Sequence, residues 1–201
     1  MATFTPRLEA PTDFSTYYGS RNAYNRFERY YGNCTWYAYG RSGEIAQHNI
    51  YNEFIITRGR GDGKDWVENT WQDHTITAEA GDPVEIKLGD ILVWGGGTYG
   101  HVEVVEQILT NTIGISYSLA GNGYADSLYW GMRYLPKSLS WGDYLGQVEH
   151  NDGSTAYLYN TLIGIIHNPY AEDMRQLAPV LSATHRRKLR NRRRYRLYVK
   201  K

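Results

Sequence analysis

The order of hydrophobic and polar positions divides the chain into a helical first part and a strand-rich second part. Asn33 belongs to the residue types that cap helix N-termini well, so we expect a helix from residue 34 to near Gln47. Asp65 and Glu68 have the spacing of a capping box, and one helical stripe follows, formed by Trp66, Val67, Thr70 and Trp71. The pattern therefore predicts two helices, preceded by an irregular N-terminal arm.

From residue 80 onward the pattern changes to that of β-strands. Residues 81–90 form a strand or turn that leads into the first apolar run. Short apolar or alternating runs, separated by Gly, Asn and Pro turns, predict strands at residues 91–94, 101–108, 113–118, 128–134 and 162–167. Helices followed by a run of adjacent strands favour an α+β fold with an antiparallel sheet.

Length and composition limit the class of protein. A chain of 201 residues has the size of one domain with a small appendage, and it can bury a sizeable core. Its single cysteine, Cys34, excludes an internal disulfide and a cysteine-based zinc site. No run approaches the ~18 apolar residues of a transmembrane helix. The N-terminus lacks a basic segment followed by an apolar one, so we expect no signal peptide.

Charge is unevenly distributed along the chain. Residues 185–201 contain 10 of the 22 Lys and Arg and no acid, so the body holds 12 basic against 21 acidic residues, a net charge of −9. We expect a domain with its N-terminal arm at 1–170, a linker at 171–184 and a basic tail at 185–201. Three interpretations of the tail stay open: a solvated terminus, contact with an anionic polymer such as teichoic acid or nucleic acid, or docking in a larger assembly.

The free thiol is the first candidate for chemistry. A cysteine reacts as its thiolate, and a free cysteine has a pKa of about 8.5. A helix N-terminus contributes only ~0.3–1 kcal/mol, which is less than one pKa unit, so an imidazolium neighbour is needed. Among six histidines, His101 follows the turn WGGGTYG and opens a strand, so its ring can stand at the rim of the sheet facing a cleft. A buried, inert Cys34 is the alternative.

Two sequence blocks resemble a known family. GNCTWYAYGR (32–41) and GDILVWGGGTYGHVEVVEQI (89–108) are similar to the signature blocks of the CHAP family, the cysteine, histidine-dependent amidohydrolase/peptidase domain. PRLEAP, GDGKDW and LIGIIHNPY also resemble the CHAP endolysins of phages that infect Gram-positive bacteria. The likeness extends over about residues 5–170. It implies a papain-like fold, with Cys34 as the nucleophile and His101 as its partner.

The third catalytic position departs from the family pattern. The family usually places an Asn, Asp or Glu on the strand after the histidine strand, where this chain has Tyr117 between two serines. A tyrosine does not orient and stabilise an imidazolium as a carboxylate does. Asn122, in the following loop, is the first candidate, although a turn residue is an equal interpretation. Glu103 is the second, because residues two apart on a strand share a face. A bare Cys–His dyad is the third.

Several further residues have two interpretations. Asn33 is a candidate for the oxyanion hole, with an ordinary N-cap as the alternative. Trp36 and Trp94 are candidates for a substrate groove, with core packing as the alternative. Some CHAP endolysins bind calcium just upstream of the cysteine, but here that stretch has one carboxylate, Glu28. Calcium needs several oxygen ligands, so we expect no metal and no cofactor.

The resemblance implies a cysteine amidase or endopeptidase that cuts an amide bond of Gram-positive peptidoglycan. It implies a phage-encoded protein, either an endolysin that reaches the wall from the host cytoplasm through a holin or a lysin in the virion tail. The basic tail would contact anionic wall polymers or phage tail proteins. The bond cut, N-acetylmuramoyl–L-alanine or a peptide link, stays open. The alternative is a catalytically weak virion structural protein whose tail binds nucleic acid or another virion component.

Overall fold

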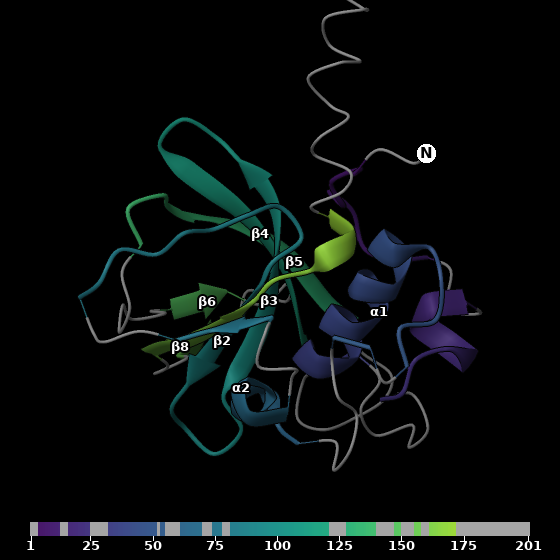
Figure 1. Ribbon diagram of the computed structural model, residues 1–201. Helices are drawn as coiled ribbons and strands as arrows, with labels where there is room; N and C mark the ends of the chain where they lie inside the picture. The colour runs from purple at the N-terminus through teal and green to yellow at the C-terminus, as the bar shows by residue number, and fades with distance from the viewer. Residues whose placement is uncertain are drawn as a thin grey trace, which may run out of the picture.

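The molecule combines a few helices with an antiparallel sheet (Figure 1). The computed structural model describes residues 4–12, 16–24, 32–51, 53–54, 61–69, 74–77, 81–120, 128–139, 147–149, 155–157 and 161–171. This arrangement confirms the predicted α+β class and is consistent with a papain-like fold. The predicted linker, apart from residue 171, and the basic tail at 185–201 lie outside the described residues.

Helix α1 spans Cys34–Ala46. The side-chain Oδ1 of Asn33 accepts a hydrogen bond from the backbone N–H of Trp36 at 2.8 Å, which is the arrangement of an N-cap. Gln47 ends the helix in the left-handed conformation, with φ of 59°. The helix predicted from residue 34 to near Gln47 is therefore confirmed at both ends.

The second helical segment differs from the prediction. A 3-10 turn, η3 (Gly63–Asp65), is followed by the short helix α2 (Trp66–Asn69). Oδ2 of Asp65 accepts a hydrogen bond from the backbone N–H of Asp62 at 2.8 Å, so Asp65 closes a capping box instead of opening one. The prediction was three residues too late because Asp62 and Asp65 have the same spacing as Asp65 and Glu68. No helix among the described residues has both the length and the apolar character to cross a bilayer.

The strands form a sheet in the order β1-β8-β2-β3-β4-β5, with neighbours antiparallel, and β6 and β7 pair separately. The predicted strands are confirmed, whereas residues 84–90 lead into β2 without regular strand structure. The bounds are β1 Thr75–Ile76, β2 Ile91–Gly95, β3 His101–Ile108, β4 Thr112–Ala120, β5 Leu128–Pro136, β6 Gln147–Glu149, β7 Thr155–Tyr157 and β8 Thr161–Ile166.

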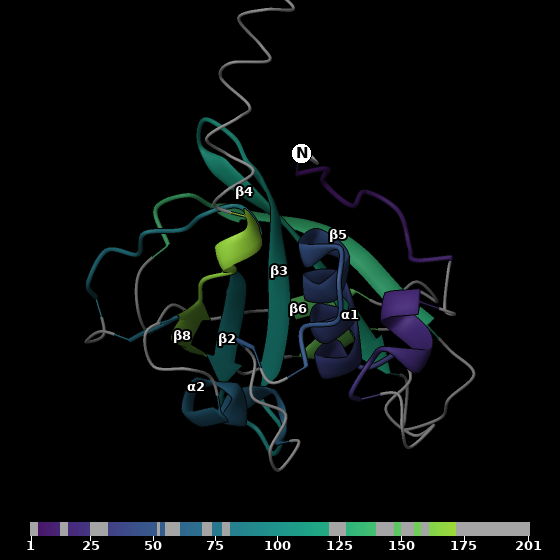
Figure 2. The same cartoon turned by 45° about the vertical axis from the view of Figure 1, so that its right-hand side comes forward.

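Apolar side chains pack on both faces of the sheet. Helix α1 and a π-helical turn, η1 (Thr16–Ser20), lie on one face, and Figure 2 shows α1 alongside β3. Successive residues of β3 point to opposite faces: Val102 and Val104 join the cluster of Trp36 on the α1 face, whereas Val105 joins that of Trp94 on the other. The beginning of β3 is thereby enclosed on both sides.

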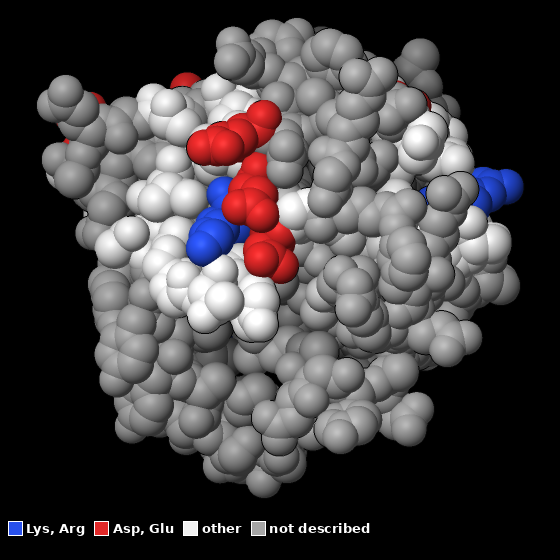
Figure 3. Space-filling model, turned by 90° about the horizontal axis from the view of Figure 1, so that it is seen from below, with Lys and Arg blue, Asp and Glu red and all other residues white. Residues whose placement is uncertain are grey.

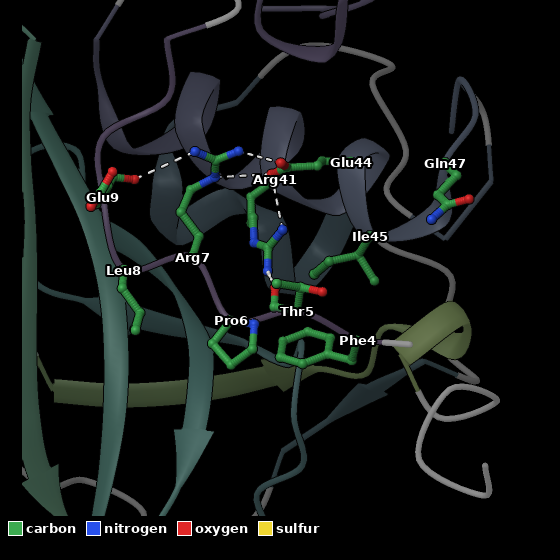
Figure 4. A pocket seen from close by; sticks show the side chains of 10 residues that line it. All are labelled: Phe4, Thr5, Pro6, Arg7, Leu8, Glu9, Arg41, Glu44, Ile45 and Gln47. Carbon is green, nitrogen blue, oxygen red and sulfur yellow. Dashed lines mark hydrogen bonds and ion pairs between the residues drawn. The ribbon is translucent and has the colours of Figure 1, made fainter. Parts of the chain in front are cut away.

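The N-terminal arm is held to α1 and the sheet by a buried ionic network. Nε of Arg41 donates to Oε1 of Glu106 at 2.9 Å, and Glu106 has no exposed surface. From the arm, the backbone N–H of Arg7 donates to Glu106 at 2.9 Å. The side-chain Nε of Arg7 donates to Glu44 at 3.0 Å (Figure 4). A buried carboxylate requires such partners. The arm is therefore part of the folded body.

The same network borders a cavity of about 500 Å³ between arm residues 4–9 and the last turns of α1, from Arg41 to Gln47 (Figure 4). Arg41 lies ~10 Å along the helix from Cys34, at a rise of ~1.5 Å per residue. This cavity therefore belongs to the junction of arm and helix, and not to the surroundings of the cysteine.

Candidate active site

Cys34 is the first residue of α1, and the loop before it is tied to the sheet. Gly32 adopts a φ of 82°, which a glycine adopts without steric cost. The hydroxyl of Ser118 on β4 donates to the carbonyl oxygen of Gly32. Cys34 itself is partly exposed. The thiol is thus held at a helix start where solvent reaches it, which argues against the inert buried thiol.

His101 is the first residue of β3 and pairs with Trp94 on the neighbouring strand β2. Gly100, with φ of 63°, forms the turn before it. A Cβ placed on Gly63 would lie 3.0 Å from the backbone of His101, so η3 packs directly against this strand end. The predicted strand start is confirmed, but the residue is only 1% exposed and does not stand in an open cleft.

The structure brings Cys34 and His101 together, and their side chains share a hydrogen bond. Burial of the ring disfavours the imidazolium, but the sulfur of Cys34 and the carboxylate of Glu103 outweigh burial and raise the pKa of His101 to about 9. The ring is therefore an imidazolium at neutral pH. A cation beside a cysteine favours the thiolate, which is the nucleophilic form.

Glu103 is the acid that lies beside this ring. Its Oε1 is 3.3 Å from Nε2 of His101, which leaves Nδ1 as the ring nitrogen available to the thiol. Its Oε2 accepts hydrogen bonds from Nη2 of Arg133 at 2.7 Å and from Nε1 of Trp94 at 3.1 Å. Burial alone would raise the pKa of this carboxyl, but Arg133 and then His101 outweigh burial and lower it. The carboxylate is therefore ionised and directed at the imidazolium.

Glu103, the second candidate from the sequence for the third position, is thus the described candidate whose carboxylate lies beside His101. Asn122, the first candidate, lies outside the described residues. Tyr117 is near His101, with ring centroids 6.4 Å apart and ring planes at 68°. It contacts the imidazole with an aromatic ring and offers no carboxylate.

The remaining sequence candidates have structural positions. Trp36 and Trp94 are fully buried, which corrects the expectation that they line a substrate groove, since no ligand reaches a side chain without exposed surface. The indole N–H of Trp36 donates to the carbonyl oxygen of Tyr18 at 2.9 Å, whereas that of Trp94 donates to Glu103. The side-chain oxygen of Asn33 is engaged in capping α1, which is the alternative interpretation given for it.

Arg133 is the member of this group that the sequence did not reveal. It lies 30 positions after Glu103, on β5. Its only local signal is a charged residue within an apolar strand pattern, and such a residue usually faces solvent. Here its side chain is 16% exposed, because the strand register turns it toward the same sheet face as Glu103.

Among the described parts of the chain, no three His, Cys, Asp or Glu side chains gather in a way that would hold a metal ion. Glu28 and its neighbours, the stretch considered for calcium, lie outside the described residues.

The site lies at the end of the molecule where β2 ends and β3 begins, beside α2 (Figure 1). Figure 3 views this end and shows a group of acidic side chains next to basic ones. The segment of η3 and α2 carries charges of both signs, with Asp62, Lys64, Asp65 and Glu68. Polar groups therefore border the buried histidine on its η3 side.

Comparison with known proteins agrees with this geometry. Residues 23–120 match the CHAP domain family. The match supports a CHAP domain in this part of the chain. The matched segment contains Cys34, His101 and Glu103 and ends with β4, so Arg133 and arm residues 4–9 lie outside it. Members of the family are cysteine, histidine-dependent amidohydrolases or peptidases.

No curated protein matches the chain. Among solved structures, one described as "The crystal structure of Ly7917" is similar at 14% sequence identity, covering 68% of this chain and 54% of that chain, with a TM-score of 0.39. The chain thus spans about half the length of that protein.

Proposed function

We propose that the protein hydrolyses an amide bond of bacterial peptidoglycan, with Cys34 as nucleophile, His101 as its acid and base, and Glu103 as the carboxylate that orients His101. The observation that carries this proposal is the Cys34–His101–Glu103 array within a CHAP domain, with an imidazolium beside the thiol and a carboxylate 3.3 Å behind it.

In the proposed reaction, the thiolate of Cys34 attacks the amide carbonyl carbon and forms a C–S bond. His101 donates its proton to the leaving nitrogen as the C–N bond breaks, and an amine departs. A water molecule then attacks the thioester while His101 accepts its proton. The C–S bond breaks, a carboxylic acid leaves, and the thiolate–imidazolium pair is restored.

The oxyanion of each tetrahedral intermediate needs hydrogen-bond donors. The first N–H groups of a helix have no acceptor within that helix. Since the Asn33 cap engages the N–H of Trp36, the N–H of Cys34 is the backbone donor that we assign to the oxyanion. Asn33 supports this arrangement by fixing the start of the helix.

The test is hydrolysis of purified Gram-positive peptidoglycan by the wild type and by Cys34→Ala and Cys34→Ser. We expect both variants to lose at least ~10³-fold in rate, since removal of a nucleophile costs this much or more. Circular dichroism and melting temperatures establish that they remain folded. Equal release of wall fragments by the wild type and folded Cys34→Ala would refute the proposal.

We further propose a phage lysin, either an endolysin or a component of the virion tail, because segments outside the two signature blocks also resemble phage CHAP endolysins. Mass spectrometry of the released fragments distinguishes an N-acetylmuramoyl–L-alanine amidase, which frees the stem peptide from the sugar, from an endopeptidase, which leaves an amine within the peptide. Fragments with no new terminus at either type of bond would contradict both assignments.

A further inference from the structure

Glu103 is held through one of its two oxygens. Two donors, Nη2 of Arg133 and Nε1 of Trp94, both point at Oε2. A carboxylate with both donors on one oxygen presents the other oxygen in a fixed direction. That oxygen, Oε1, lies 3.3 Å from Nε2 of His101. The orientation of the carboxylate is therefore set by groups outside the Cys–His pair.

Arg133 is in turn held by two aromatic rings. Its Cζ lies 5.8 Å from the ring centroid of Trp94 and 6.0 Å from that of Tyr117, within the range of cation–π contacts. Tyr117 also contacts His101, so its ring touches both the guanidinium of Arg133 and the imidazole of His101. A Cβ on Gly131, opposite Tyr117 on β5, would lie 2.6 Å from this ring. Gly131 thus leaves the space that the ring occupies.

Charges alternate in sign from Arg133 to Glu103 and His101, and Cys34 lies beside the imidazolium. Glu103 has no exposed surface, and a carboxylate in that position stays ionised only if cations compensate for its lost hydration. Arg133 and His101 are the cations that face it, and Tyr117 is the titratable group that β4 adds beside them. At the start of β3, α1 presents Cys34 to His101, and η3 carries Lys64.

We infer that Arg133 is a positioning residue of this site: with the ring of Tyr117 and the indole N–H of Trp94, it fixes the Glu103 carboxylate on His101. The inference rests on the proposed function. It accounts for Tyr117 standing where the family resemblance led us to expect an acid or amide. The acid is on β3 instead, and β4 and β5 supply what holds it. Arg133 lies outside the matched CHAP segment, so the family match does not assign it this role.

The test compares Arg133→Met, which removes charge and donors, with Arg133→Lys, which keeps one cationic donor. Arg21→Met is the matched control, because Arg21 is exposed. Cys34 is the only cysteine, so its alkylation by iodoacetamide reports this site alone. The measurements are the alkylation rate against pH, and kcat and KM on soluble peptidoglycan fragments.

For Arg133→Met we expect kcat to fall on the order of 10- to 100-fold with little change in KM, the effect of leaving a buried charged group without its partner. The acid edge of the alkylation profile should move to higher pH, because Glu103 takes up a proton more readily without Arg133. Arg133 reaches Glu103 through one nitrogen, Nη2, so Arg133→Lys should restore most of both properties. Arg21→Met should match the wild type.

An acid edge that stays in place or moves to lower pH in Arg133→Met would overturn the inference, as would Arg133→Lys behaving like Arg133→Met. If Arg133→Met does not fold, Tyr117→Leu replaces it. That variant keeps the guanidinium but removes a ring that holds it, and an unchanged acid edge would contradict the inference. Alkylation needs no wall substrate. A shifted edge in a protein that cuts no peptidoglycan would therefore uphold the positioning role and refute the proposed function.

Discussion

Replacing Glu103 by Gln is expected to inactivate the protein, although the side chain keeps its size and one oxygen. Arg133 and Trp94 both require an acceptor at the position of Oε2. The amide oxygen of Gln therefore takes that position, and its NH2 group faces Nε2 of His101, where Oε1 lies 3.3 Å away in the wild type. An NH2 group donates to Nε2 only when that nitrogen carries no proton. The variant thus favours the tautomer with its proton toward Cys34, which does not accept the thiol proton.

The magnitude follows from two contributions. The neighbours of His101 raise its pKa from 6.5 to about 9, a net effect of ~3 kcal/mol at ~1.4 kcal/mol per unit. Loss of the carboxylate removes part of this stabilisation, which lowers the population of the thiolate–imidazolium form on the order of 10- to 100-fold. The reversed hydrogen bond adds to it, since the same carboxylate-to-amide change in a Ser-His-Asp triad costs ~10⁴ in kcat through the wrong tautomer. We expect kcat to fall ~10³- to 10⁴-fold.

The assay is kcat at pH 7 on soluble peptidoglycan fragments, with the alkylation rate of Cys34 as a second readout. Glu85→Gln is the matched control, because the Glu85 side chain is 78% exposed, and it should retain wild-type kcat. A folded Glu103→Gln protein with more than about a tenth of the wild-type kcat would show that the carboxylate does not control the tautomer of His101.

Four further outcomes are expected. Because the pKa of His101 is raised to about 9, kcat/KM should decline as pH rises through about 9. The stability that this ring contributes to the fold is complete below pH 6.5 and should be lost between pH 6.5 and about 9. An alkaline limb near pH 6.5 would contradict this. Arg41→Met should lower the free energy of unfolding in urea by ~3–5 kcal/mol, because it leaves Glu106 buried without its main ionic partner, and Glu106→Gln added to it should restore part of the loss. Deletion of residues 185–201 should leave hydrolysis of isolated peptidoglycan largely intact; loss of hydrolysis with retained folding would favour the tail as the functional element. EDTA should not change the initial rate, and a rate restored by added calcium would show that the sequence prediction of no metal is wrong.

Local signals were sufficient for the elements that carry the reactive pair. Asn33 was identified as a cap from its residue type alone, and the structure shows its side chain capping α1. The strand at 101–108 followed from alternation after a glycine turn, and β3 has these bounds. The capping box predicted to begin at Asp65 was wrong, although it also came from a local signal. The pairs Asp62–Asp65 and Asp65–Glu68 have the same spacing, and packing of η3 against His101 selects between them.

The sequence by itself determined that Cys34 begins a helix and that His101 begins a strand, because caps, turns and periodicity act over a few residues. It also allowed Glu103 to be named, since alternation puts it on the same strand face as His101. Only the tertiary structure decided that this carboxylate is the group beside the ring, held by Trp94 and by Arg133, 30 positions along the chain. Those contacts depend on the register of β2, β3, β4 and β5. Register is set by the packing of the whole sheet, so it leaves no signal in the residues on either side of Arg133.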